Sequence, residues 1–157
     1  MADLVRARSH AAALPADAQR LLGAAPPLGG QPQPGYAEAH NNLGFALAGR
    51  GDLDEAITHY RKALESDSEN AGFHYNLAMA LVARGQARPA IAHLFRAVEL
   101  QPEFVQARNN LGILLARSGR LDEAIEQFRQ ALEIEPGSAE VRRNLDIAGR
   151  RPADAAQ

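Results

Sequence analysis

The amino-acid sequence repeats itself with a fixed period and without a gap. Residues 37–70, 71–104 and 105–138 form three blocks of equal length that align with one another throughout. The first and third blocks are identical at 17 positions, and the first and second blocks at 14. A period of about 34 residues is typical of repeat proteins, in which each unit buries its apolar face against its neighbours. We therefore expect the chain to contain three equivalent units.

Each block is predicted to form two helices joined by a tight turn. Apolar residues recur at steps of three and four, which is typical of the buried face of an α-helix. The turn is marked by a glycine in every block, namely Gly51, Gly85 and Gly119. Pro102 and Pro136 follow the last apolar residues of two blocks and are expected to end the second helix. The units are therefore helical hairpins, and the fold class is all-α.

Small residues recur where the two helices of a block are expected to approach each other. On the first helix these are Gly44, Ala78 and Gly112, and on the second helix they are Ala56, Ala90 and Ala124. A third set shares one position on the second helix and consists of the larger residues Tyr60, Leu94 and Phe128. We expect these larger side chains to fill the space between one hairpin and the next.

The pattern resembles the tetratricopeptide repeat, a motif of the same period with characteristic positions for large and small residues. The matching residues of the third block are Arg108, Leu111, Gly112, Leu115, Ala124, Phe128 and Pro136. Those of the first block are His40, Leu43, Gly44, Leu47, Ala56, Tyr60 and Ser68. The family's opening tryptophan is absent, and its place is taken by His40, His74 and Arg108. The resemblance implies a right-handed superhelical solenoid of helix-turn-helix repeats, whose first helices line a concave groove.

The segments outside the three repeats differ in composition. Residues 23–36 are rich in proline and glycine and are expected to form a linker. Residues 1–22 precede it, and their sequence is compatible with two short helices. Residues 139–151 begin the repeat pattern again and are predicted to form a helix that caps the third repeat. A polar tail, 152–157, ends the chain.

Composition and charge exclude several classes of protein. The 157 residues include no cysteine, which excludes a disulfide framework, cysteine metal sites and a cysteine nucleophile. Lys and Arg number 17 against 19 Asp and Glu, so the net charge of −2 argues against nucleic-acid binding. No stretch approaches the roughly 18 apolar residues of a membrane helix, and no signal peptide is recognisable. We expect no membrane association and a cytoplasmic location.

The sequence contains no recognisable catalytic apparatus. The G-x-S-x-G, P-loop and G-x-G-x-x-G elements are absent, so we expect neither enzyme activity nor a cofactor. Equivalent positions of adjacent repeats should lie about 8–10 Å apart, which is too far for His40 and His74 to share a metal ion. We therefore predict no metal site. His40 and His74 are expected to pack in the tryptophan position, and His59 and His93 to lie on helix surfaces.

Four asparagines share one repeat position, three in the successive blocks and one beyond them: Asn42, Asn76, Asn110 and Asn144. The resemblance implies that they line the groove, in an array similar to that of the repeat domain of peptide O-linked N-acetylglucosamine transferases. An amide both donates and accepts hydrogen bonds, which suits a peptide backbone, although it can equally bond to neighbouring helices. Further groove residues follow from the same register: Asn41, Phe45, Tyr75, Met79, Val82, Asn109 and Ile113.

These observations predict a noncatalytic scaffold that binds an extended, uncharged peptide segment of a protein partner in the groove. Some related domains hold acidic chaperone tails with a basic clamp, which is not expected here because Asn41, Gln106 and Asn110 occupy its positions. Glu38 and Arg117 are expected at the two ends of the groove. Two alternatives remain, namely self-association into a homo-oligomer through the uncovered first repeat, and an accessory module that recruits substrates for a transferase acting in trans.

Overall fold

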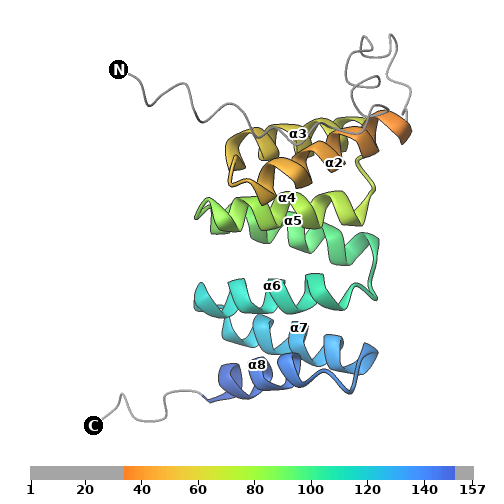
Figure 1. The fold of residues 1–157 in the computed structure, drawn as a ribbon. Coiled ribbons are helices and arrows are strands. Elements are labelled where there is room, and N and C mark those ends of the chain that lie inside the picture. The colour runs from red at the N-terminus through yellow and green to blue at the C-terminus, as the bar shows by residue number, and fades with distance from the viewer. Residues whose placement is uncertain (1–33, 151–157) are drawn as a thin grey trace, which may run out of the picture. The chain divides into compact units, whose positions relative to one another are not determined.

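A computed structural model describes residues 34–150, which fold into helices without a strand (Figure 1). The chain divides into two compact units, and the boundary lies between Ser68 and Glu69. The first unit contains α2 (Pro34–Gly49) and α3 (Leu53–Ser66). The second contains α4 (Ala71–Ala83), α5 (Ala87–Leu100), α6 (Val105–Arg117), α7 (Leu121–Ile134) and α8 (Ala139–Gly149). This arrangement confirms the all-α helical-repeat fold that the sequence predicts.

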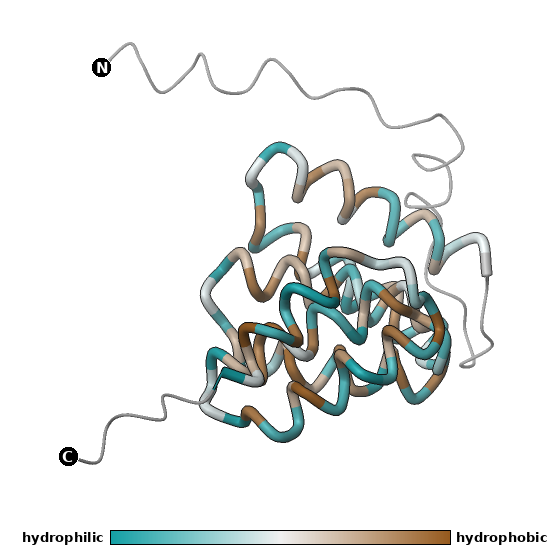
Figure 2. Tube along the Cα trace, turned by 90° about the horizontal axis from the view of Figure 1, so that it is seen from below, coloured by the Kyte–Doolittle hydropathy of each residue, from teal (hydrophilic) through white to brown (hydrophobic). Residues whose placement is uncertain are grey.

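Each predicted repeat forms one helical hairpin. Helix α2 packs against α3, α4 against α5, and α6 against α7. In the second unit α5 also contacts α6, while α8 contacts both α7 and α6. Along the helices apolar residues alternate with polar ones, as the colours of Figure 2 show. The apolar residues form the buried side of each hairpin, so the polar residues remain available to solvent and to a partner.

The turn inside each hairpin depends on a glycine, as predicted. Gly51, Gly85 and Gly119 have φ angles of 85°, 75° and 81°, and they are the residues with positive φ in the described part of the chain. A side chain with a Cβ is strained in this left-handed conformation, whereas glycine is not. Helices α5 and α7 end at Leu100 and Ile134, shortly before Pro102 and Pro136.

The two helices of a hairpin approach each other closely at the predicted small residues. A Cβ added to Gly44 would lie 2.8 Å from Cε1 of Tyr60, and a Cβ added to Gly112 would lie 2.5 Å from Cε1 of Phe128. The aromatic rings therefore pack against the first helix of their own hairpin, and Phe128 also lines a cavity toward α8, on the side where we expected contact with the next hairpin. In the middle hairpin the corresponding pair is Ala78 and Leu94. Where leucine stands in place of the aromatic residue, alanine therefore stands in place of the glycine.

The ends of the described chain refine the predicted boundaries. Helix α2 begins at Pro34, so the prediction that the linker continues to residue 36 was wrong. Proline suits this position because the first turn of a helix needs no backbone N–H donor and the proline φ is helical. Helix α8 begins at residue 139, where the predicted capping helix begins, but ends at Gly149 and not at residue 151; its Val141 and Ala148 are buried. The predicted N-terminal helices, the remainder of the linker and the C-terminal tail lie outside the described residues.

Candidate functional site

The first helices of the hairpins, together with α8, each present an amide and an apolar side chain three positions apart. Side chains with this spacing lie on the same face of a helix. The pairs are Asn42 with Phe45 on α2, Asn76 with Met79 on α4, Asn110 with Ile113 on α6, and Asn144 with Ile147 on α8. Phe45 is 69% exposed and Ile147 is 63% exposed. In each unit, the exposed apolar side chain beside a repeated amide makes the helix face that carries the two a candidate interaction surface.

Helices α4 and α6 are joined at this face by Asn110. Its Nδ2 donates a hydrogen bond to the Tyr75 hydroxyl at 3.0 Å and lies 3.4 Å from Sδ of Met79. The Tyr75 ring also packs against Phe104, with ring centroids 4.9 Å apart. Burial raises the pKa of the Tyr75 hydroxyl above its ordinary value. The structure thus brings together three of the predicted groove residues, Tyr75, Met79 and Asn110.

Helices α6 and α8 are joined by a chain of hydrogen bonds with a defined direction. Asn109 donates from Nδ2 to the Glu140 carboxylate at 2.9 Å, and its Oδ1 accepts from Nδ2 of Asn144, also at 2.9 Å. A carboxylate only accepts, so Glu140 determines which end of the Asn109 amide faces Asn144. Asn109 is only 6% exposed. It consequently orients Asn144, which is half-buried and directs its donor inwards.

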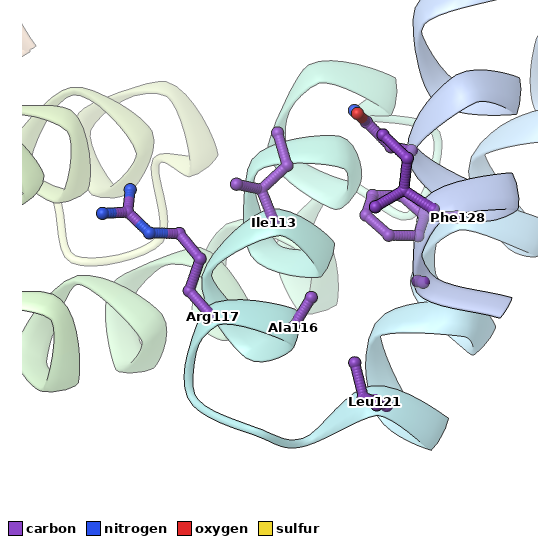
Figure 3. A pocket seen from close by; sticks show the side chains of 8 residues that line it. Ile113, Ala116, Arg117, Leu121 and Phe128 are labelled. Atoms are coloured by element: carbon purple, nitrogen blue, oxygen red, sulfur yellow. The ribbon is translucent and has the colours of Figure 1, made fainter. Parts of the chain in front are cut away.

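A cavity of about 330 Å³ opens beside Asn144, between α6, α7 and α8. Figure 3 shows Ile113, Ala116 and Arg117 on α6, with Leu121 and Phe128 of α7 beyond them. The wall also includes Asn144, Ile147 and Ala148 from α8. The Arg117 side chain extends away from Leu121 and Phe128, and its guanidinium points away from the cavity (Figure 3). The cavity is therefore mainly apolar, with the amide of Asn144 in its wall.

Comparison with protein families accounts for the repeated geometry. One family model, described as a tetratricopeptide repeat, matches residues 75–139, and a second, described as a TPR repeat, matches residues 47–85. The chain contains tetratricopeptide (TPR) repeats. The two matches extend from the first predicted repeat into the first residue of α8, so they include parts of all three predicted repeats.

Solved TPR structures share the fold. The first TPR of Spaghetti (RPAP3), bound to the HSP90 peptide SRMEEVD, is 25% identical with a TM-score of 0.72, covering 76% of this chain and 95% of that one. YrrB, described as a TPR protein with an unusual peptide-binding site, is 35% identical with a TM-score of 0.66, covering 71% of this chain and 58% of that one.

A curated relative matches a shorter segment. Heat shock protein STI1 of Saccharomyces cerevisiae is 51% identical over 37 residues, which is 24% of this chain and 6% of STI1. The chain therefore spans a small part of that relative, about the length of one TPR repeat.

The structure divides the predicted groove residues between the two units. Asn41, Asn42 and Phe45 belong to the first unit, where Asn41 is half-buried and the other two are exposed. In the second unit Tyr75, Asn76, Met79, Val82, Asn110, Ile113 and Asn144 are half-buried, and Asn109 is buried. Sequence reasoning missed Ile147, although it lies exactly one repeat period after Ile113. It also missed Glu140, whose role depends on the packing of α8 against α6.

The histidines of the first two TPR repeats form pairs within a hairpin. Nδ1 of His40 lies 2.7 Å from Nδ1 of His59, and Nδ1 of His74 lies 2.9 Å from Nδ1 of His93. We expected His59 and His93 on helix surfaces, but both are half-buried and each contacts the histidine of the first helix of its hairpin. The overlooked signal was the equal sequence separation of the two pairs, which joins the two helices of a hairpin. In the third repeat Arg108 holds the same position and donates to Gln127 at 3.2 Å.

The environment of His40 and His59 disfavours their positively charged forms. Burial, followed by the positive charge of a protonated His59 and of Lys62, lowers the pKa of His40 to about 4. Burial and Lys62 also lower the pKa of His59. At neutral pH one Nδ1 donates its proton and the other accepts it. Nε2 of His40 is buried without a hydrogen-bond partner, which favours the tautomer with the proton on Nδ1 of His40.

The described residues contain neither a cluster of metal-binding side chains nor a helix that could span a membrane. Between Pro34 and Arg150 no three His, Asp or Glu side chains gather in an arrangement able to hold a metal ion. Over the same range no helix combines the length and apolarity that are needed to cross a bilayer. In the second unit the candidate site is the face of α4, α6 and α8 that carries the repeated amides and the apolar side chains beside them.

Proposed function

We propose that the second unit binds an extended peptide segment of a protein partner along α4, α6 and α8, as a noncatalytic interaction module. Two similar solved structures support this proposal, because one is a TPR domain bound to an HSP90 peptide and the other is described by its peptide-binding site. This chain has the same fold as these two structures, but a fold does not determine which ligand is bound. The ligand preference of this chain therefore depends on its own side chains.

The observation that carries the proposal is the orientation of Asn110 and Asn144. Both amides donate to neighbouring residues of the protein, at 3.0 Å and 2.9 Å, and this holds them in place. Their Oδ1 atoms accept no hydrogen bond from the described residues and are therefore available to the N–H groups of a peptide. Because the amides are already ordered, binding costs little side-chain entropy. Ile113 and Ile147 lie beside them and can contact the side chains of the ligand.

We further propose that the segment opposite α4 and α6 is uncharged. Gln106 and Asn110 are neutral amides, and they hold positions at which a clamp for acidic chaperone tails would place cations. Recognition by amides suits a peptide backbone irrespective of its side chains. We also propose that the repeated asparagines act in the same way as the similar asparagine array of O-linked N-acetylglucosamine transferase repeats. The peptide SRMEEVD, with three carboxylate side chains, is expected to bind at least about tenfold more weakly than an optimised ligand.

The proposal is tested by selecting ligands for the full chain from a random-peptide display library. The selected peptides are then titrated against the wild type and against the double variant Asn110→Ala, Asn144→Ala. Loss of two hydrogen bonds of about 1 kcal/mol each predicts an affinity at least about tenfold lower. Gln101→Ala, which removes an exposed amide just after the end of α5, is the matched control and should bind normally.

Circular dichroism must show equal helicity for all three proteins before the affinities are compared. If no peptide is enriched, or if the double variant binds as tightly as the control, the proposed binding face is wrong.

A further inference from the structure

We propose that the segment bound along α4, α6 and α8 carries a lysine or arginine side chain, which pairs with the carboxylate of Glu140 at the α8 end. The residues of the segment opposite α4 and α6 stay uncharged. This inference rests on the proposed peptide-binding function, and it specifies the chemistry of the ligand at one end of the same face.

Glu140 belongs to the helix face that carries the repeated amides. It precedes Asn144 by four residues on α8, and side chains with this spacing lie on the same face of a helix. Ile147, three residues after Asn144, shares that face and is 63% exposed. Glu140 is exposed as well. A segment that contacts Asn144 therefore passes beside an accessible carboxylate.

The carboxylate of Glu140 is held toward α6 by a buried amide. Nδ2 of Asn109 donates to Oε1 of Glu140 at 2.9 Å, and Oδ1 of the same Asn109 orients Asn144. Oε2 of Glu140 accepts no hydrogen bond from the residues that the structure describes, and Glu140 forms no ion pair with them. Because one oxygen is already fixed, pairing the carboxylate with a ligand cation costs little side-chain entropy.

The charge of Glu140 also acts on the part of the face that α4 contributes. Burial and, after it, the negative charge of Glu140 raise the pKa of the Tyr75 hydroxyl. That hydroxyl accepts from Asn110, the neighbour of Asn109 on α6. A ligand that contacts Asn110 and Asn144 thus lies in the field of this carboxylate, which attracts a cation. The same field disfavours acidic segments such as SRMEEVD.

The negative charge is confined to one end of the face. In the two preceding repeats the position of Glu140 is occupied by the neutral residues Gly72 and Gln106. Arg117, the charged residue in line with the amide of α6, follows Asn110 by seven residues and therefore lies about 10 Å further along that helix. The cation is consequently expected at one position of the ligand, opposite α8.

The inference is tested with the peptides selected on the full chain, synthesised with acetylated N-termini so that the terminal amine carries no charge. They are expected to share a Lys or Arg at one position. Replacing that residue by Met should weaken binding to the wild type by about twofold to fivefold, as expected for a solvent-accessible ion pair. The same replacement should have no effect on binding to Glu140→Gln, which keeps an oxygen that can accept from Asn109. With Glu140→Lys, a Glu at that position should bind better than the cation.

Asp146→Asn is the matched control, because it removes a carboxylate from the same helix. Asp146 is exposed and lines a depression together with Ile125 and Arg129 of α7, whereas Glu140 bonds to α6. This variant should prefer the cationic peptide as strongly as the wild type does. Raising NaCl from about 0.05 M to about 0.5 M should reduce the preference of the wild type and leave Glu140→Gln unchanged. Circular dichroism must first show equal helicity for all variants.

The outcomes separate this inference from the proposed function. Peptides that lose affinity with the double asparagine variant but share no cation would overturn the inference and leave peptide binding in place. A cation that matters equally to the wild type and to Glu140→Gln would do the same. A preference that Asp146→Asn removes as fully as Glu140→Gln would refute the pairing with Glu140. Failure to select any peptide would overturn both the inference and the proposed function.

Discussion

Substitution of Gly112 by alanine is expected to destabilise the third repeat, even though alanine favours helix formation by about 1 kcal/mol relative to glycine. The added Cβ would lie 2.5 Å from Cε1 and 2.8 Å from Cζ of Phe128, well inside van der Waals contact. The ring cannot easily move away, since Phe128 is 1% exposed. Overpacking of this kind costs about 1–3 kcal/mol. After the gain in helix propensity is subtracted, the net loss in the free energy of unfolding should be up to about 2 kcal/mol.

The middle repeat supplies the compensating change. Its Ala78 and Leu94 occupy the positions of Gly112 and Phe128, so the double variant Gly112→Ala, Phe128→Leu recreates a pair that the chain already uses. Phe128→Leu alone should cost about 1 kcal/mol. If Leu makes room for the new Cβ, the double variant should be more stable than the sum of the single variants by about 1–2 kcal/mol.

Urea unfolding followed by far-UV circular dichroism measures these differences. Gly149→Ala is the matched control, because a Cβ at Gly149 in α8 would meet no atom within 4 Å. This control should be neutral or stabilising. A stabilising Gly112→Ala, or strictly additive effects in the double variant, would refute the close-approach explanation.

Three further predictions follow from particular contacts. Because the folded-state pKa of His40 is about 4 against 6.5 for an ordinary histidine, the unfolded chain binds more protons in that window. The contribution of His40 to the free energy of unfolding should be fully present above pH 6.5 and should fall by on the order of 2–3 kcal/mol as the pH drops to 4. In urea unfolding, His40→Phe should reduce this dependence of stability on pH. Asn109→Ala should cost about 1–3 kcal/mol because it removes a buried amide that hydrogen-bonds both Glu140 and Asn144, whereas Gln106→Ala should be neutral in the same assay. Gly119→Ala, at a φ of 81°, should lower stability by about 1–2 kcal/mol, and an unchanged melting temperature would contradict the role assigned to this turn.

Residue periodicity predicted the parts of the candidate site that repeat. The repeat spacing identified the asparagines of α4, α6 and α8, and the same spacing would have included Ile147 beside Ile113. It did not predict that Asn109, a neighbour of the repeated Asn110, is buried and hydrogen-bonded to Glu140. Two adjacent residues on a helix face directions about 100° apart, and which of them is covered depends on the next helix.

The sequence by itself determined the hairpins of this protein, because the signals that form them are local. Helical periodicity, a glycine at each turn and a small residue opposite each large one act within a single repeat. Only the tertiary structure decided how particular side chains are paired. The bond from Asn144 to Asn109 and the contact of His40 with His59 join residues on different helices, 35 and 19 positions apart. Such pairings depend on distances of a few tenths of an ångström and on the rotation of one helix against another, and side-chain packing between helices sets both.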